Sequence, residues 1–303
     1  MTSINKYMKV GIVHFMAFPA TIKGEGPILE TIKKIAVDDY FNAIEVTWMK
    51  DDLVRKQAAR LLETSKIKVC YGAQPRLLTT GLNPNHLEEV ERAKAADTLK
   101  EAVDEAKQLG AKGIAFLSGK YEEKTKEEAY QQLLKTTKEI CQYAEKMDMN
   151  VVLEIFDYDV AKKSLIGPTL LAKRFAEDVK KDYKNFGLMV DLSHIPMYYE
   201  SIQEAIRPIK DHIVHAHIGN TVISDKEAEG YGDEHIRFGF PNSENDVDEV
   251  VEFLKELINI GYLDPTDPKV VSFEIKPWHD EDVDMLIANA KRTLNEAWAK
   301  LDL

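Results

Sequence analysis

The sequence predicts an α/β protein that folds as a single (β/α)8 barrel, a TIM barrel, across residues 1–303. Eight short apolar segments alternate with longer amphipathic segments, which is the pattern of strands connected by helices in a parallel sheet. Most of the apolar segments are continuously hydrophobic, as in strands that are covered on both faces. The first segment leads into HFMAFPATIKGEG, which lacks the GxGxxG of an open dinucleotide-binding sheet. A closed barrel of eight strands fits these observations best.

The expected strands are MKVGIVHFM from Met8, AIEVTW from Ala43, IKVCYG from Ile67, KGIAFLS from Lys112, NVVLEIFD from Asn150, FGLMVDLS from Phe186, HIVHAHIG from His212 and KVVSFEIKP from Lys269. The expected helices span residues 27–36, 51–64, 87–110, 126–147, 169–182, 201–210, 246–261 and 281–301. Gly110 and Gly261 stand where helices should end. The loop at about 220–245 is longer than βα connections usually are, so it is expected to cover the substrate rather than to be a disordered excursion. No linker marks a second domain.

The bulk composition excludes several classes of protein. A formal net charge of −12 argues against a nucleic-acid partner, which would require a basic surface. The two cysteines, Cys70 and Cys141, form no CxxC motif and no disulfide framework. No apolar run is long enough to cross a membrane, so no membrane partner is expected and the expected location is cytoplasmic.

Acidic and imidazole side chains stand at the carboxyl ends of the four late strands. Glu154, Asp191 and Glu274 occupy equivalent places in otherwise apolar segments, and His217 joins them from a fourth. Burying such carboxylates is costly unless they are paired or bind a metal, so internal salt bridges are the alternative to a metal site. Three carboxylates and one imidazole suit one divalent ion, with Mn²⁺ preferred and Mg²⁺, Co²⁺ or Zn²⁺ as rivals. The absence of a thiolate ligand disfavours a structural zinc site.

The segments LEIFD, VDLSH, HAHIG and SFEIKP together resemble the xylose isomerase-like superfamily, in particular its sugar phosphate isomerases/epimerases and ketose 3-epimerases. The resemblance covers essentially the whole chain in strand order. It implies that Glu154, Asp191, His217 and Glu274 hold the metal. It also implies that Glu154 and Glu274 act as the catalytic acid/base pair, and that His194 of the Asp-x-x-His pattern binds a substrate hydroxyl.

Other residues near strand ends or in the long loop are expected to contact a carbohydrate substrate. They are His14, Trp48, Gln74, Asp157, Arg237 and Lys276. His14 and Trp48 have packing roles as alternatives, and His215 is expected to bond to backbone. The ketose 3-epimerases have a glutamate and an arginine where this chain has Val160 and Ile223. The candidates to replace those contacts are Asp157, Asp159, Lys162, Lys163 or Arg237.

The predicted function is therefore a metal-dependent sugar isomerase or epimerase that removes a proton next to a sugar carbonyl through an enediolate. A barrel subunit of a carbon–glycoside deglycosidase acting on 3-oxo-glucosides is the alternative, since its elimination starts with the same deprotonation. It would bring a small β-rich partner subunit, and a homo-oligomer is the other candidate assembly. A DNA-repair endonuclease with three zinc ions is disfavoured by the charge and by a single clear metal set. A non-catalytic sugar-binding barrel is disfavoured because all four ligands are present.

Overall fold

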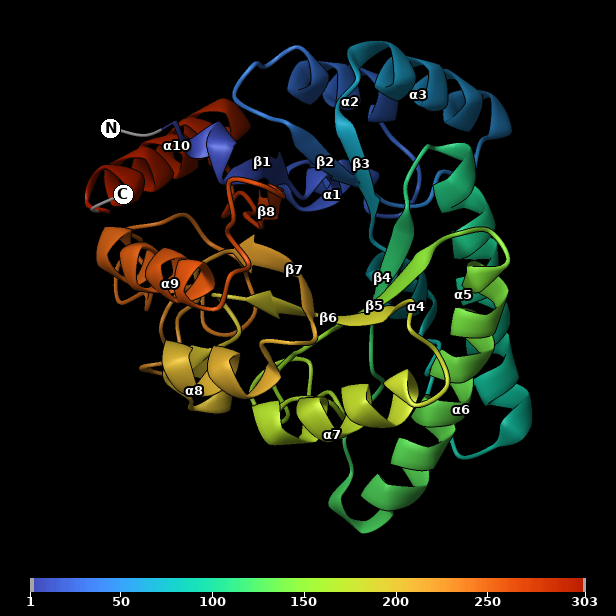
Figure 1. Ribbon diagram of the computed structural model, residues 1–303. Helices are drawn as coiled ribbons and strands as arrows, with labels where there is room; N and C mark the ends of the chain where they lie inside the picture. Colours follow the sequence, from blue (N-terminus) through green and yellow to red (C-terminus); the bar gives the residue numbers. More distant parts are fainter. Residues whose placement is uncertain (1–2, 302–303) are drawn as a thin grey trace.

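A ring of helices surrounds parallel strands in the computed structural model, which describes residues 3–301 (Figure 1). The strands are β1 (Met8–Ile12), β2 (Ala43–Val46), β3 (Lys68–Tyr71), β4 (Gly113–Leu117), β5 (Asn150–Glu154), β6 (Phe186–Asp191), β7 (Ile213–Ile218) and β8 (Lys269–Phe273). Each lies within a segment in which the sequence predicted a strand. Six of them form a sheet in the order β1-β8-β7-β6-β5-β4, and β2 pairs with β3.

Backbone contacts at both edges join the β2–β3 pair to the six-stranded sheet. A parallel bridge links Val13 to Glu45, and the Asn42 amide donates to the Val10 carbonyl at 2.8 Å. On the other side a parallel bridge links Gly72 to Ala115. The eight strands therefore close into a barrel, and the predicted (β/α)8 fold is confirmed.

The helices are α1 (His14–Ala17), α2 (Ile28–Ala36), α3 (Asp52–Ser65), α4 (Gln74–Thr80), α5 (Glu89–Gln108), α6 (Lys126–Glu145), α7 (Thr169–Lys180), α8 (Ile202–Ile206), α9 (Val247–Asn259) and α10 (Val283–Ala299). Short 3-10 helices are η1 (Ile4–Lys6), η2 (Pro19–Thr21), η3 (Glu123–Thr125), η4 (Pro196–Tyr198) and η5 (Arg207–Ile209). The helix expected over 201–210 is divided into α8 and η5, because Pro208 lacks the amide that would continue an α-helix. The sequence analysis did not predict α1 or α4.

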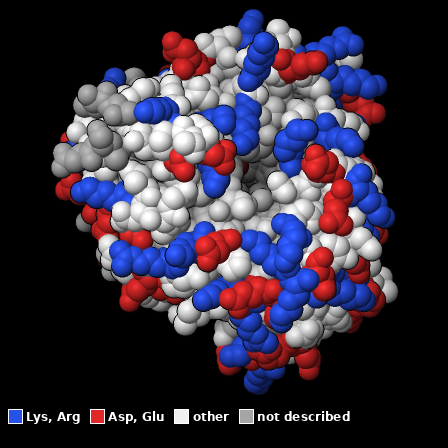
Figure 2. Space-filling model, in the orientation of Figure 1, with Lys and Arg blue, Asp and Glu red and all other residues white. Residues whose placement is uncertain are grey.

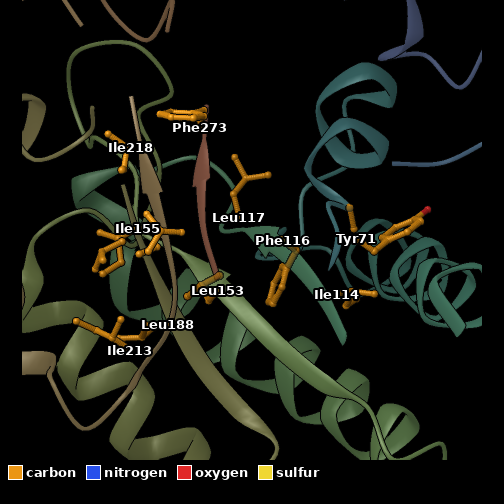
Figure 3. Packing of buried hydrophobic residues seen from close by; sticks show 14 of the residues in the cluster. Tyr71, Ile114, Phe116, Leu117, Leu153, Ile155, Leu188, Ile213, Ile218 and Phe273 are labelled. Atoms are coloured by element: carbon orange, nitrogen blue, oxygen red, sulfur yellow. The ribbon is translucent and has the colours of Figure 1, made fainter. Parts of the chain in front are cut away.

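Successive residues of β5 face opposite sides of the strand, towards the surrounding core or towards the barrel interior. In β5, Val151 and Leu153 pack into the continuous hydrophobic cluster, part of which is shown in Figure 3. Val152 instead lines a small cavity at the amino end of the barrel, and Glu154 comes two residues later on the same face. Side chains two residues apart therefore form layers inside the barrel, and the upper layer carries the polar groups.

The segment between β7 and α9 is ordered by buried side-chain hydrogen bonds. The side-chain oxygen Oδ1 of Asn220 accepts from the backbone amides of Thr221 and Asn245, at 2.9 and 2.8 Å. The Thr221 hydroxyl donates to the Gly232 carbonyl at 2.6 Å, which closes the loop on itself. The predicted long loop is therefore a folded part of the barrel end.

Charged side chains of both signs are interspersed around a central hollow on the face seen in Figure 2. The net charge of −12 is thus not separated into one extended basic or acidic surface on that face. Among residues 3–301, no helix is both long and apolar enough to cross a membrane.

Candidate metal centre

Four buried side chains from consecutive late strands meet at the carboxyl end of the barrel. Glu154 ends β5, Asp191 ends β6, His217 lies near the end of β7, and Glu274 directly follows β8. One potential ligand atom from each lies within 4.8 Å of all the others. The barrel brings together the four residues that the sequence analysis selected, because parallel strands end at a common mouth.

Two carboxylate oxygens in this cluster have no hydrogen-bond partner. Glu154 Oε1 and Asp191 Oδ2 are fully buried and unpaired. Leaving a buried charged oxygen without a partner costs free energy, so such atoms need an explanation. Both lie close to His217 Nδ1, at 3.7 and 3.8 Å. Three carboxylates and one imidazole around unpaired oxygens fit a divalent cation.

Neighbouring charges shift the pKa values of His217 and Glu274 in this cluster. His217 Nδ1 lies 2.6 Å from Glu274 Oε2. Burial alone would lower the pKa of His217, but Glu45 and Glu274 outweigh it and raise the pKa well above the usual value. The pKa of Glu274 is raised, first by burial and also by the nearby Glu154 carboxylate. Without a cation, the cluster therefore holds a proton between His217 and Glu274.

A carboxylate inside the barrel orients the candidate ligand histidine from below. Glu45 Oε1 lies 3.0 Å from His217 Nε2 and 2.6 Å from His215 Nε2. The prediction that His215 bonds to backbone is therefore wrong: its partner is a side chain from β2. Glu45 forms a second group of potential ligands with these two histidines. The sequence contained a signal for this role of Glu45, because a charged residue in an otherwise apolar strand needs a partner.

The long loop adds two buried groups that the sequence analysis did not place in the site. His235 lies in a third group of potential ligands with Asp191 and His194. Asp233 Oδ1 lies 2.8 Å from His235 Nε2 and 3.1 Å from His194 Nε2. The Asp233 carboxylate also accepts from the Lys162 ammonium. The sequence pattern indicated one metal set, whereas residues 3–301 contain three overlapping groups. The group with His235 forms because folding carries this loop back over the strand ends.

The two histidines in the third group are held as cations. Burial opposes the charged form of His194, but Asp191 and Asp233 raise its pKa to about 10. The same balance raises the pKa of His235 to about 9, with Glu274 and Asp233 as the main charges. Asp233 lies at one nitrogen of each ring, and the other nitrogens contact the Ile155 carbonyl and the Ser193 hydroxyl, so both rings of this group already have partners.

A cavity of about 220 Å³ opens directly onto the cluster. Two of the predicted substrate contacts reach it. Gln74, at the start of α4, donates from Nε2 to Glu154 Oε2 at 2.6 Å. Lys276 lines the opposite side and bonds to Glu234 at 2.6 Å. Lys162, Asp233 and His235 line the cavity as well, so its polar wall comes from both halves of the chain.

Two residues expected at the early-strand side of the mouth do not line the cavity. The His14 ring is buried against α2, where Nε2 lies 2.7 Å from the Thr31 hydroxyl. Burial lowers its pKa to about 3, so the ring is neutral. Trp48 donates from its indole nitrogen to the Ile22 carbonyl at 2.9 Å and packs beneath that segment. In this structure the two rings pack against α2 and the Ile22 segment instead of the cavity, and their contact with a substrate stays a prediction.

Asp157 and Arg237 also have structural partners instead of facing the cavity. Asp157 is fully buried and accepts from the backbone amides of residues 160–163. It thereby shapes the turn that carries Lys162 to the cavity. Arg237 bonds to Glu281 at 3.0 Å and to the Gly239 carbonyl at 3.0 Å. Substrate contact by these two residues stays a prediction, whereas Lys162, another candidate to replace the epimerase contacts, lines the cavity.

Known proteins provide an independent comparison. A D-tagatose 3-epimerase-like protein superposes with a TM-score of 0.71 at 22% identity, covering 97% of this chain and 99% of that chain. The IolI protein with a bound zinc atom gives a TM-score of 0.73 at 19% identity, with coverage of 98% and 100%. An AP endonuclease of family 2 from Brucella melitensis gives 0.68 at 15% identity, with coverage of 93% and 96%. No curated protein matches the chain.

At these identities, similarity to solved structures shows the fold alone. The model of the family described as xylose isomerase-like TIM barrel matches residues 34–288. This range includes most of the barrel and all four residues of the candidate metal centre, Glu154, Asp191, His217 and Glu274. The chain therefore belongs to the xylose isomerase-like TIM barrel family.

Proposed function

We propose that this protein is a divalent-metal-dependent sugar isomerase or epimerase, with Glu154, Asp191, His217 and Glu274 as metal ligands. The observation that carries the proposal is the pair of buried oxygens without hydrogen-bond partners on Glu154, which lines the cavity, and on Asp191, which lies beside it in the same ligand group. A divalent ion held there would polarise a sugar carbonyl and favour loss of the proton on the adjacent carbon. Mn²⁺ is the preferred ion for this oxygen-rich set.

Glu154 and Glu274 are the proposed acid/base pair. They approach the cavity from β5 and from the end of β8, and each has a different hydrogen-bond partner. Gln74 orients the Glu154 carboxylate through Oε2, so that Oε1 can bind the cation and Oε2 is the proposed acceptor of the proton from carbon. The raised pKa of Glu274 favours its protonated form, as a proton donor on the other side requires. The two carboxyl groups thus reach one cavity from different strands, with different partners.

The remaining polar side chains would bind and orient the sugar. Lys162, Asp233 and Lys276 line the cavity beside the pair. Asp233 and Lys162 bond to each other, and Asp233 also holds His194 and His235 in place. Such a rigid set of donors and acceptors recognises hydroxyl groups, and a cavity of about 220 Å³ suits a single sugar ring. The similar structures include a D-tagatose 3-epimerase-like protein and an L-ribulose 3-epimerase, which agrees with a carbohydrate substrate.

The endonuclease alternative is less favoured although the barrel is shared. Recognition of DNA requires basic residues that neutralise several phosphates, whereas this chain has a net charge of −12. The similarity to an AP endonuclease is at 15% identity and concerns the fold. The polar groups around the metal cluster instead enclose a small cavity.

The test is proton exchange in D₂O. The purified protein, stripped of metal and then loaded with Mn²⁺, is incubated with ketoses, aldoses and 3-oxo-glucosides, and deuterium incorporation is followed by NMR. We expect one sugar carbon next to the carbonyl to exchange, and Glu154→Gln and Glu274→Gln to slow this at least about 100-fold. Glu281→Gln, which lies outside the cavity, is the control. Full exchange in both glutamate variants would overturn the proposal.

A further inference from the structure

A second and larger cavity adjoins the sugar cavity. It has a volume of about 650 Å³ and lies between α4, the turn that follows it, and the end of β4. Figure 1 places these elements on the same side of the barrel. Leu78 and Lys162 line both cavities, so the larger groove begins where the sugar cavity ends.

The groove presents apolar side chains to solvent. Its aliphatic and proline lining consists of Leu77, Leu78, Leu82, Pro84, Leu87, Leu117 and Ala129. Leu78 is 49% exposed and Leu87 is 42% exposed, and both exposures fall in this groove. Single exposed leucines are ordinary, but two that line one concave surface beside a candidate active site indicate a binding surface.

The two asparagines of the groove are bonded to backbone groups around them. Asn83 Oδ1 accepts from the Asn85 amide at 2.9 Å. Asn85 in turn donates to the Lys120 carbonyl at 3.1 Å and accepts from the Gly119 amide. A side chain at position 119 would collide with Asn83, so the two loops can approach this closely only with glycine there. These groups have few hydrogen bonds left for a ligand.

The outer rim is fixed in the same way. The Pro84 carbonyl accepts from the Thr136 hydroxyl at 2.8 Å, and the Leu87 carbonyl accepts from Gln132 at 3.2 Å. Both donors belong to α6, so this helix holds the turn open beside β4. The groove is therefore a preformed surface of the barrel end.

We infer that this groove binds an apolar ring attached to the reacting sugar, so that the substrate is a glycoside or an equivalent sugar conjugate rather than a free monosaccharide. This inference rests on the proposed function, because it places the sugar in the smaller cavity. A second sugar ring is less suitable as the occupant, since the aliphatic side chains of the groove offer it no hydrogen bonds and Asn85 already bonds to the backbone of Lys120 and Gly119. The apolar group would pack on Leu78 and Leu87.

The test compares two ligands that differ in the attached group. Methyl 3-oxo-β-D-glucopyranoside and phenyl 3-oxo-β-D-glucopyranoside are titrated into the Mn²⁺-loaded protein by calorimetry. We expect the phenyl compound to bind at least about tenfold more tightly, the lower range for adding an apolar group to an apolar pocket. Equal dissociation constants for the two compounds would overturn the inference.

A matched pair of variants localises the effect. Leu87→Ser removes an apolar side chain from the groove, whereas Leu53→Ser changes an exposed leucine of α3 that does not line it. We expect Leu87→Ser to reduce the ratio of the two dissociation constants at least about fivefold, and Leu53→Ser to leave it unchanged. If the ratio of the two dissociation constants falls in both variants or in neither, the phenyl group binds elsewhere and the inference is contradicted.

Binding and exchange separate this inference from the proposed function. If the phenyl preference and its loss in Leu87→Ser are found while no sugar carbon exchanges in D₂O, the groove holds and the proposed chemistry fails. If exchange occurs with equal rates and affinities for both compounds, the chemistry holds and the groove inference fails.

Discussion

Glu45 Oε1 lies 3.0 Å from His217 Nε2, on the side of the imidazole ring opposite the metal cluster. A proton on Nε2 directed at this carboxylate leaves Nδ1 as the nitrogen that faces Glu154, Asp191 and Glu274. The charge of His215 and His217 keeps the pKa of Glu45 well below its usual value, although burial opposes this. Glu45 therefore remains an acceptor and determines which nitrogen can bind a cation.

The first prediction concerns this contact. Glu45→Gln should weaken Mn²⁺ binding about 10- to 100-fold, because loss of the carboxylate removes the partner that orients the ring. The measurement is the Mn²⁺ dissociation constant by calorimetry, with NMR of the imidazole nitrogens to identify the tautomer. Glu256→Gln, a similarly buried glutamate that pairs with Arg207 away from the site, is the control. Unchanged affinity in Glu45→Gln would show that the contact has no part in positioning His217.

The second prediction is that the centre binds one divalent ion. In the other two groups of potential ligands the histidines already have carboxylate partners. Glu45 bonds to two histidines, and Asp233 bonds to His194 and His235. Metal analysis after loading and desalting should therefore find about one Mn²⁺ per chain, and Asp191→Asn should bind less than a tenth of that amount. Two or three ions per chain in the unaltered protein would show that these groups rearrange to hold metal.

The third prediction is that metal affinity rises with pH. His217 has a folded-state pKa raised well above 6.5, so its ring carries a proton at neutral pH when no cation is bound. A cation must displace that proton, and raising the pH towards this pKa makes the displacement easier. Mn²⁺ affinity should increase by up to about tenfold per pH unit between pH 6 and 8, measured by titration in two buffers with different heats of ionisation. No proton release in either buffer would contradict the assignment.

The fourth prediction concerns the turn after β5. Asp157→Ala should reduce the free energy of unfolding by about 3 kcal/mol, because buried backbone donors lose their acceptor. Sugar exchange should also decrease, since the turn carries Lys162 into the cavity. Urea unfolding measures the first effect, and Asp159→Ala, at an exposed position of the same turn, is the control. Equal stability of the two variants would remove the structural role assigned to Asp157.

The cytoplasmic location, and the choice between a homo-oligomer and a small β-rich partner subunit, remain predictions from the sequence. The groove inference bears on the deglycosidase alternative, because that chemistry requires a group attached to the sugar. The D₂O experiment distinguishes the two reactions: exchange without loss of the group indicates isomerisation or epimerisation, and release of the group indicates elimination.

The sequence by itself determined the barrel and the four residues of the metal cluster. Apolar segments alternating with amphipathic helices specify parallel strands, and charged residues at the ends of those strands must meet at one mouth. Glu154, Asp191, His217 and Glu274 could be predicted because their place depends on strand position, which the hydrophobic pattern reveals.

The tertiary structure alone decided which other residues share the site. His14, Trp48, Asp157 and Arg237 stand near strand ends or in the long loop, but local turns direct them towards Thr31, Ile22, the turn after β5 and Glu281. Asp233 and His235 reach the site because a long loop folds back over the barrel, and Glu45 reaches His217 from across its interior. Contacts of this kind join residues far apart in the chain, and the local periodicity of a sequence carries no information about them.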